Sequence, residues 1–273
     1  MVRTRSRSGR PMFEGSVSVV RRGADVAWSG REAAIGETQG HTPQWMLAVD
    51  LDLCTGCQAC VAACFAENNI GVSGGEQVAM GRGRHWIKVE RYWERSEFPD
   101  VKARFLPLMC QQCGNAPCEP VCPVFASVHS KDGLNSQVYN RCIGTRYCAQ
   151  NCPYKVRVFN FFAPEFPAPL EQQLNPDVTV RPVGIMEKCT FCVQRIRRAR
   201  EEARVEGREL VDGEIVPACA QTCPPGAIVF GDGADPESRV AKLFRSERGF
   251  RLFESLNTKP SVVYLGKGET RDG

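Results

Sequence analysis

Cysteines and their spacing restrict the possible folds of this chain more than any other feature. The sequence has 15 cysteines in 273 residues, and they fall into four runs that approximate the pattern CxxCxxCxxxCP. Bacterial ferredoxins use such runs to bind cubane iron–sulfur clusters through thiolate ligands. A closed disulfide scaffold would leave one of 15 thiols unpaired. The spacing therefore predicts cluster sites rather than disulfides.

Three of the four runs contain four cysteines. The second run has a widened spacing, and an insertion of 26 residues divides the fourth run. In chain order, the first run contains Cys54, Cys57, Cys60 and Cys64, the second contains Cys110, Cys113, Cys118 and Cys122, and the fourth contains Cys189, Cys192, Cys219 and Cys223.

The third run, RCIGTRYCAQNCP over 141–153, lacks one cysteine. Cys142, Cys148 and Cys152 take the first, third and fourth ligand places, and Thr145 takes the second. A threonine hydroxyl stays protonated near neutral pH and is a poor ligand for iron. We therefore predict three [4Fe–4S] clusters and one [3Fe–4S] cluster, although water or hydroxide at the open corner would allow a fourth iron.

A ligand map follows from the order of the runs. In two-cluster ferredoxins the fourth cysteine of a run binds the other cluster. Runs one and four enclose runs two and three, so we pair them in that nested order. The predicted ligands are Cys54, Cys57, Cys60 and Cys223 for site I; Cys64, Cys189, Cys192 and Cys219 for site II; Cys110, Cys113, Cys118 and Cys152 for site III; and Cys122, Cys142 and Cys148 for site IV, with Thr145 at the corner without a ligand.

The nested order predicts an α+β fold in which one two-cluster ferredoxin-like domain is inserted in another, so that the two are interlocked, with extended loops and terminal arms. The expected parts are an N-terminal arm at 1–43, an outer domain in two pieces at 44–104 and 166–235, an inserted domain at 105–165, and a C-terminal extension at 236–273. The arm is rich in Arg, Gly and Ser, so it either lies on a partner or is disordered.

Local patterns predict the main elements. Alternating apolar residues favour strands at 45–53 and 86–94, and the glycine-rich segment 71–83 indicates a loop. Two hairpins are expected, with their turns at Asp132-Gly133 and Asp212-Gly213. The insertion in run four begins with helix formers that end at Gly207, and the part from 232 to 264 adds a helix and a strand.

Composition restricts the partners. The net charge of +4 is small for 273 residues and predicts no polyanion partner. No run of 18 apolar residues occurs, and the arginines near the N-terminus lead into no apolar segment of the kind found in secretory signals. The alternative reading is a Cys-rich zinc module that binds nucleic acid or protein through its Arg-rich helix. Zinc modules usually take their four ligands from two separated pairs of residues. Here three cysteines lie close together in sequence and a fourth follows them.

The runs CQQCGNAPCEPVCP, CIGTRYCAQNCP, EKCTFC and ACAQTCPPGAIVFGD together resemble the four-cluster iron–sulfur subunits of the molybdopterin-oxidoreductase superfamily, over about residues 45 to 265. Because of its threonine, the run CIGTRYC is most similar to the corresponding run in the iron–sulfur part of alternative complex III and of the related menaquinone reductase complex.

This resemblance implies a non-catalytic electron-transfer subunit of a membrane-associated respiratory quinone oxidoreductase complex. The implied partners are an NrfD-type integral membrane subunit that binds quinone, a molybdopterin-oxidoreductase-like large subunit and a multihaem cytochrome c, with no nucleic acid. The family also implies attachment at the membrane periphery through these partners, on the periplasmic side, with the [3Fe–4S] cluster at the end nearest the quinone. Basic residues near the third run are expected to tune the potential of that cluster: Arg141, Arg146, Lys155 and Arg157.

Overall fold

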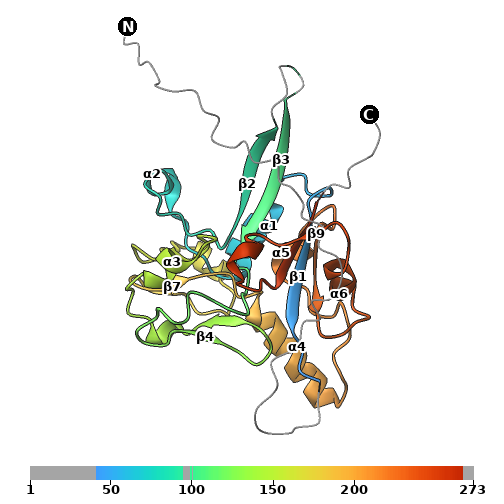
Figure 1. The fold of residues 1–273 in the computed structure, drawn as a ribbon. Helices are drawn as coiled ribbons and strands as arrows, with labels where there is room; N and C mark the ends of the chain where they lie inside the picture. The colour runs from blue at the N-terminus through green and yellow to red at the C-terminus, as the bar shows by residue number, and fades with distance from the viewer. Residues whose placement is uncertain (1–40, 95–98, 100, 267–273) are drawn as a thin grey trace. The chain divides into compact units, whose positions relative to one another are not determined.

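The computed structural model describes residues 41–94, 99 and 101–266 (Figure 1). Residues 1–40, which make up most of the expected N-terminal arm, lie outside the described residues. The helices are α1 (Ala59–Glu67), α2 (Gly74–Ala79), α3 (Tyr147–Asn151), α4 (Val193–Glu206), α5 (Ala218–Gln221) and α6 (Arg239–Phe244). The strands are β1 (Trp45–Asp50), β2 (Ile87–Glu94), β3 (Lys102–Met109), β4 (Ser127–His129), β5 (Asn135–Gln137), β6 (Val158–Phe159), β7 (Met186–Glu187), β8 (Ile228–Asp232), β9 (Gly249–Phe250) and β10 (Val262–Leu265).

The largest sheet joins the two ends of the described chain, in the order β8-β1-β10-β9. β1 runs antiparallel to β8 and parallel to β10, so that Leu47 lies opposite both Phe230 and Val262. Side chains alternate across the sheet. Ala48 faces α6 in one small apolar cluster, whereas Leu47 belongs to the main core that also contains Cys60. The sheet is therefore the wall against which the first cysteine run packs.

A long antiparallel ribbon, β2–β3, leads into the second cysteine run. Its register extends from Ile87 opposite Met109 at the base to Glu94 opposite Lys102 near the tip. Ile87 and Met109 are buried, and the ribbon extends past the helices around its base (Figure 1). The buried base fixes the point at which β3 delivers Cys110.

Two short pairings hold the remaining runs in place. The predicted hairpin β4–β5 forms, with its turn at Asp132 and Gly133, and leads to the third run. β6 pairs with β7, which brings the segment after the third run beside the segment before Cys189. Runs that are distant in sequence are thus tied by backbone hydrogen bonds.

The structure corrects two local predictions. The segment 71–83 contains the helix α2, because Gly74 takes a left-handed φ of +71° and the residues after it include helix formers. The expected hairpin at Asp212-Gly213 has a turn but no described strands. Glu214 closes this turn, because its amide bonds the carbonyl of Val211 and its carboxylate pairs with Arg208. The helix α4 ends as predicted, at Gly207.

Candidate iron–sulfur sites

Three hollows among the described residues are each lined by four cysteines. Their volumes are about 340, 350 and 310 Å³, including the open space at their mouths. The first is lined by Cys54, Cys57, Cys60 and Cys223, the second by Cys64, Cys189, Cys192 and Cys219, and the third by Cys110, Cys113, Cys118 and Cys152. Each set combines three cysteines of one run with the fourth cysteine of another, and the three sets contain the cysteines that the order of the runs assigns to sites I, II and III.

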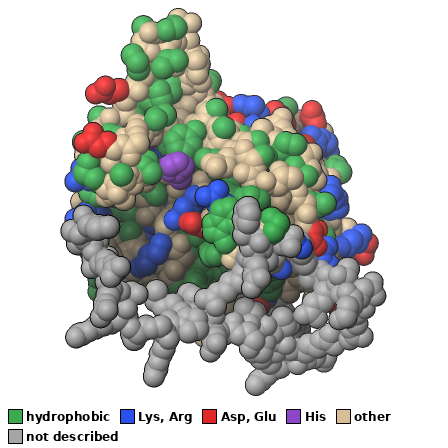
Figure 2. Space-filling view, turned by 90° about the horizontal axis from the view of Figure 1, so that it is seen from above, with side chains coloured by type: hydrophobic (Ala, Val, Ile, Leu, Met, Phe, Trp, Pro, Cys, Tyr) green, Lys and Arg blue, Asp and Glu red, His purple; other side chains and the backbone are tan. Residues whose placement is uncertain are grey.

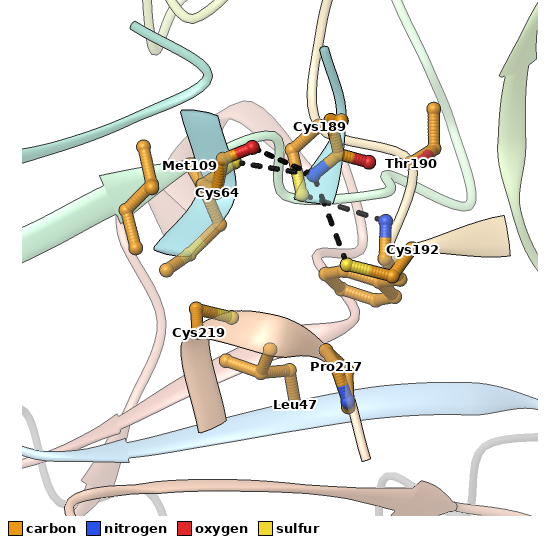
Figure 3. Close-up of a pocket in the computed structure, with 11 residues that line it drawn as sticks. Leu47, Cys64, Met109, Cys189, Thr190, Cys192, Pro217 and Cys219 are labelled. Atoms are coloured by element: carbon orange, nitrogen blue, oxygen red, sulfur yellow. Dashed lines mark hydrogen bonds between the residues drawn. The ribbon is translucent and has the colours of Figure 1, made fainter. Parts of the chain in front are cut away.

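Figure 3 displays the hollow of site II. Cys64 comes from α1, Cys189 and Cys192 from the loop before α4, and Cys219 from α5, and all four side chains surround one space (Figure 3). The amide of Asn68 donates to the sulfurs of Cys64 at 3.5 Å and of Cys192 at 3.9 Å. The site thus combines segments that are distant in sequence, and the side-chain amide of Asn68 is a hydrogen-bond donor to it.

The four runs share one backbone feature. The residue two places after the first cysteine takes a left-handed conformation in every run, at Gly56, Gln112, Gly144 and Phe191. This turn aims the amide back at the first sulfur, as the bond from Phe191 N to Cys189 Sγ of 3.5 Å shows. The third run therefore keeps the loop geometry of the complete runs, although Thr145 replaces its second cysteine.

The fourth cysteines before proline share a second feature. In each case the residue three places later is left-handed, and the amide of the fourth residue donates to the cysteine sulfur. The bond lengths are 3.1 Å from Ala126 to Cys122 and 3.3 Å from Ala227 to Cys223, and Val156 donates to Cys152. Such N–H···S bonds raise the reduction potential of a bound cluster.

At site IV, Thr145 stands where run one has Cys57. The flanking φ angles agree, at +74° for Gly144 and +60° for Arg146 against +71° for Gly56 and +63° for Gln58, and both Thr145 and Cys57 are exposed. A side chain at Gly144 would meet the carbonyl oxygen of Gly184 at 2.1 Å, so this loop is held tightly.

The three cysteines of site IV are linked indirectly, through residues that neighbour them. Cys148 is buried in the same apolar cluster that Cys142 packs against, and the amide of Met186 donates to Cys142 Sγ at 3.4 Å. Arg157 hydrogen-bonds Cys148. Burial raises the pKa of Cys122, but nearby backbone amides and the charge of Arg157 lower it by more. Cys122 and Cys148 thus share one cation.

Burial raises the pKa of thiols in the quartets, to about 11 for Cys60 and to about 12 for Cys113 and Cys189. Neighbouring thiols add to the effect, as Cys54 and Cys223 do for Cys60. Bound metal reverses this balance, because its positive charge deprotonates a coordinating thiol outright. The chemistry of these donors therefore fits a cationic group inside each hollow.

The donor spacing fits a group of several metal atoms better than a single ion. Within the described part of the chain, no three Cys, His, Asp or Glu side chains are close enough together to hold one metal ion. Zinc binds thiolates at about 2.3 Å, so four ligands of one zinc would lie within about 4 Å of each other. The quartets surround wider spaces and do not support the zinc alternative.

The Arg-rich helix α4 lends the zinc alternative no support either. Arg195 pairs with Glu67, Arg198 with Asp177 and Arg200 with Asp132. Figure 2 is seen from above Figure 1, away from α4, and on that face too basic and acidic side chains are interspersed. These three arginines of the helix therefore form ion pairs within the chain.

Cysteines of consecutive sites lie near one another. Burial and the other cysteines of site II raise the pKa of Cys219 most. Cys60 of site I is close enough to add a smaller increase. Cys110 of site III likewise acts on Cys189 of site II, and Arg157 contacts cysteines of both site III and site IV. These interactions link the four cysteine sets in the order I–II–III–IV, and Cys57 in the first set and Thr145 beside the last are exposed.

Sequence reasoning did not single out two polar residues of these sites. Asn68 is buried at the C-terminal cap of α1, four residues after Cys64, and this spacing was an available signal. Lys188 is fully buried beside Cys189, and nothing in the sequence distinguishes it from a surface lysine.

Comparison with known proteins agrees with the geometry. Residues 53–126 match the 4Fe-4S dicluster domain family. The chain is 46% identical over 230 residues to the menaquinone reductase iron–sulfur cluster-binding subunit of Nitratidesulfovibrio vulgaris, covering 83% of this chain and 90% of that protein. It is 35% identical to the Hdr-like menaquinol oxidoreductase iron–sulfur subunit 1 of Archaeoglobus fulgidus, covering 82% and 84%. It is also 34% identical to the B subunit of the polysulfide reductase of Wolinella succinogenes, covering 79% and 91%.

Among the described residues, no helix has the length and apolar character needed to cross a membrane. The four cysteine runs, the quartets that line three hollows and the extent of the similarity lead to one conclusion. The chain belongs to the family of iron–sulfur subunits of the molybdopterin-oxidoreductase complexes, which includes those of menaquinone reductase and polysulfide reductase.

Proposed function

We propose that the chain is the electron-transfer subunit of a membrane-associated respiratory quinone oxidoreductase complex, with three [4Fe–4S] clusters at sites I, II and III and one [3Fe–4S] cluster at site IV. When bound, such clusters accept and release single electrons. The ligands are the cysteines assigned above, and Thr145 leaves one corner of site IV without a protein ligand. The chain itself performs no bond chemistry.

The row of sites is the observation that carries this proposal. The inner sites hold buried cysteines such as Cys64 and Cys118, whereas Cys57 at one end and Thr145 at the other are exposed. A relay needs insulated centres in its interior and accessible ones at its ends. Cys64 of the first run lines site II and Cys223 of the fourth run lines site I, which is the exchange typical of the two runs of one two-cluster ferredoxin domain.

The surface around site IV supports a partner at that end. Phe125, Ile143 and Tyr147 lie within or beside the runs of this site and are 71%, 64% and 59% exposed. Large exposed apolar side chains in one region mark interaction sites. We assign this end to an NrfD-type quinone-binding membrane subunit, because the names of two relatives include menaquinone reductase and menaquinol oxidoreductase.

The opposite end, at Cys57, would then face a molybdopterin-oxidoreductase-like large subunit or a multihaem cytochrome c. The chain would be a peripheral membrane protein, bound through these partners on the periplasmic side. Purification of the native complex and identification of its subunits tests the assignment, and a complex without an integral membrane subunit would contradict it.

Metal content tests the cofactor assignment directly. Protein purified without oxygen should be brown and contain about fifteen iron atoms, by the count for three [4Fe–4S] and one [3Fe–4S] clusters. Its oxidised form should give the EPR signal of a [3Fe–4S] cluster. A colourless protein that contains zinc would overturn the proposal, and a spectrum of complete cubanes alone would remove the [3Fe–4S] cluster.

A further inference from the structure

Two basic side chains are buried among the cysteines. Arg157 is 6% exposed and Lys188 is 0% exposed. Among the described residues, neither forms an ion pair with a carboxylate, in contrast to buried Arg181, which pairs with Glu187 at 2.9 Å. A buried cation is costly unless a nearby negative charge offsets it. The negative groups near these two cations are the cysteine thiolates.

Arg157 lies between sites III and IV. It lines the hollow of site III, and its Nη1 donates to Cys118 Sγ at 3.3 Å and to Asn135 Oδ1 at 3.1 Å. The same guanidinium hydrogen-bonds Cys148 of site IV. Its Nε is buried and has no hydrogen-bond partner among the described residues, so one N–H remains for a group in this space.

Lys188 lies between sites II and III. Its Nζ donates to the carbonyl of Cys189 at 2.9 Å and to Gln112 Oε1 at 3.5 Å. Gln112 belongs to the run of site III, whereas Cys189 belongs to site II. The charge of Lys188 acts on the sulfurs of both Cys118 and Cys189. One buried cation thus lies between sites II and III, and another lies between sites III and IV.

We propose that Lys188 and Arg157 are electrostatic positioning residues that raise the reduction potentials of the two sites on either side of them: sites II and III for Lys188, and sites III and IV for Arg157. This inference rests on the proposed function. Reduction adds one negative charge to a site, and a cation a few ångströms away in a medium of low dielectric constant stabilises that charge. A shared cation also offsets the repulsion between electrons on neighbouring sites.

A crossed pair of variants in the complete, cluster-loaded protein tests this. Arg157→Gln and Lys188→Gln each remove a charge but keep an N–H donor. We expect Arg157→Gln to lower the reduction equilibrium constants of sites III and IV at least tenfold, which is 59 mV for one electron, and to leave site II unchanged. Lys188→Gln should lower those of sites II and III and leave site IV unchanged. EPR-monitored redox titration measures each site.

Two controls accompany these variants. Arg204→Gln removes an exposed arginine of α4 that pairs with Glu201 and should move no potential. Arg157→Lys keeps the charge and should restore most of the shift at sites III and IV. The inference would be overturned if the two variants changed no reduction potential, or if they changed the reduction potentials of all four sites equally.

Loss of a cluster is separated from loss of charge by iron analysis of every variant. If Arg157→Gln binds less iron, Asn135→Asp takes its place, because it sets a carboxylate beside the guanidinium at the 3.1 Å contact. Both sites III and IV should then fall in potential, and an unchanged site IV would overturn the inference. Failure of the proposed function is distinguishable, since the unaltered protein would then lack the iron and the EPR signals.

Discussion

Thr145 is the residue on which the make-up of site IV depends. Its loop has the same left-handed turns as the first run, and its side chain is exposed where Cys57 is exposed. The backbone therefore holds a ligand place to which the threonine hydroxyl contributes poorly, because a hydroxyl does not ionise near neutral pH. A thiol introduced at this place needs no rearrangement of the loop.

We expect Thr145→Cys to complete the site. Iron should rise from about fifteen to about sixteen atoms, and the oxidised-state [3Fe–4S] signal in the EPR spectrum should disappear. Thr145→Ser is the matched control, because it keeps a hydroxyl and should keep the signal. If the Cys variant retained the signal at full strength, the open corner would have to lie elsewhere.

At the scale of the elements, β10 connects the main sheet to the second cysteine run. The hydroxyl of Tyr264 donates to the carbonyl of Pro107 at 3.0 Å and accepts from Gln111 Nε2 at 3.1 Å. Tyr264 is fully buried, as is Gln111. This pair of bonds holds β3, and with it Cys110, against the sheet that carries the first run.

Tyr264→Phe should therefore destabilise the protein by about 1–3 kcal/mol, because it leaves buried polar groups without their partner. Denaturant unfolding followed by tryptophan fluorescence measures the change, with iron content as a check on cluster loading. Tyr92→Phe on the exposed part of β2 is the control and should have no measurable effect. Equal stability of the two variants would contradict the role assigned to Tyr264.

The elements also mark what the sequence could and could not predict. Strands with alternating apolar residues, the hairpin at Gly133 and the helix that ends at Gly207 were predictable, because each has a local signal. The helix α2 was missed because its glycines outweighed the helix formers among them. The failed hairpin at Gly213 had the right turn residues, but pairing needs a ladder that no local pattern guarantees.

The grouping of cysteines into quartets could be anticipated because ligand spacing is a property of the chain. The buried positions of Lys188 and Arg157 depend on how the runs pack against one another, so their contacts were not predictable. The sequence indicated Arg157 only as one of several basic residues near site IV, and the structure singles it out by its contact with Cys118.

At the scale of the whole molecule, the order of the sites makes a prediction about flow. In the intact complex, Cys113→Ser combined with Cys118→Ser should remove the cluster of site III, which has neighbours on both sides. Added quinol should then reduce site IV but not sites I and II, because an electron on site IV would have to cross the empty site III to reach site II. Rapid-freeze EPR measures which signals appear, with iron analysis to verify that only one cluster is lost.

The single variant Cys57→Ser at the exposed end is the comparison for that experiment. It alters site I and should leave reduction of sites II, III and IV by quinol intact. If sites I and II were reduced as fast without site III as with it, the linear order would be wrong.

The parallel pairing of β1 with β10 has a consequence for how the protein is made. Trp45–Asp50 leaves the ribosome long before Val262–Leu265, and β8, its other neighbour, also comes from the last third of the chain. Contacts of such high sequence separation form slowly, and exposed strand edges aggregate. The early thiols thus await their partners Cys219 and Cys223 throughout most of translation. We therefore expect metal to be loaded late, and we expect scaffold proteins that shield the nascent first run to increase the yield of mature protein.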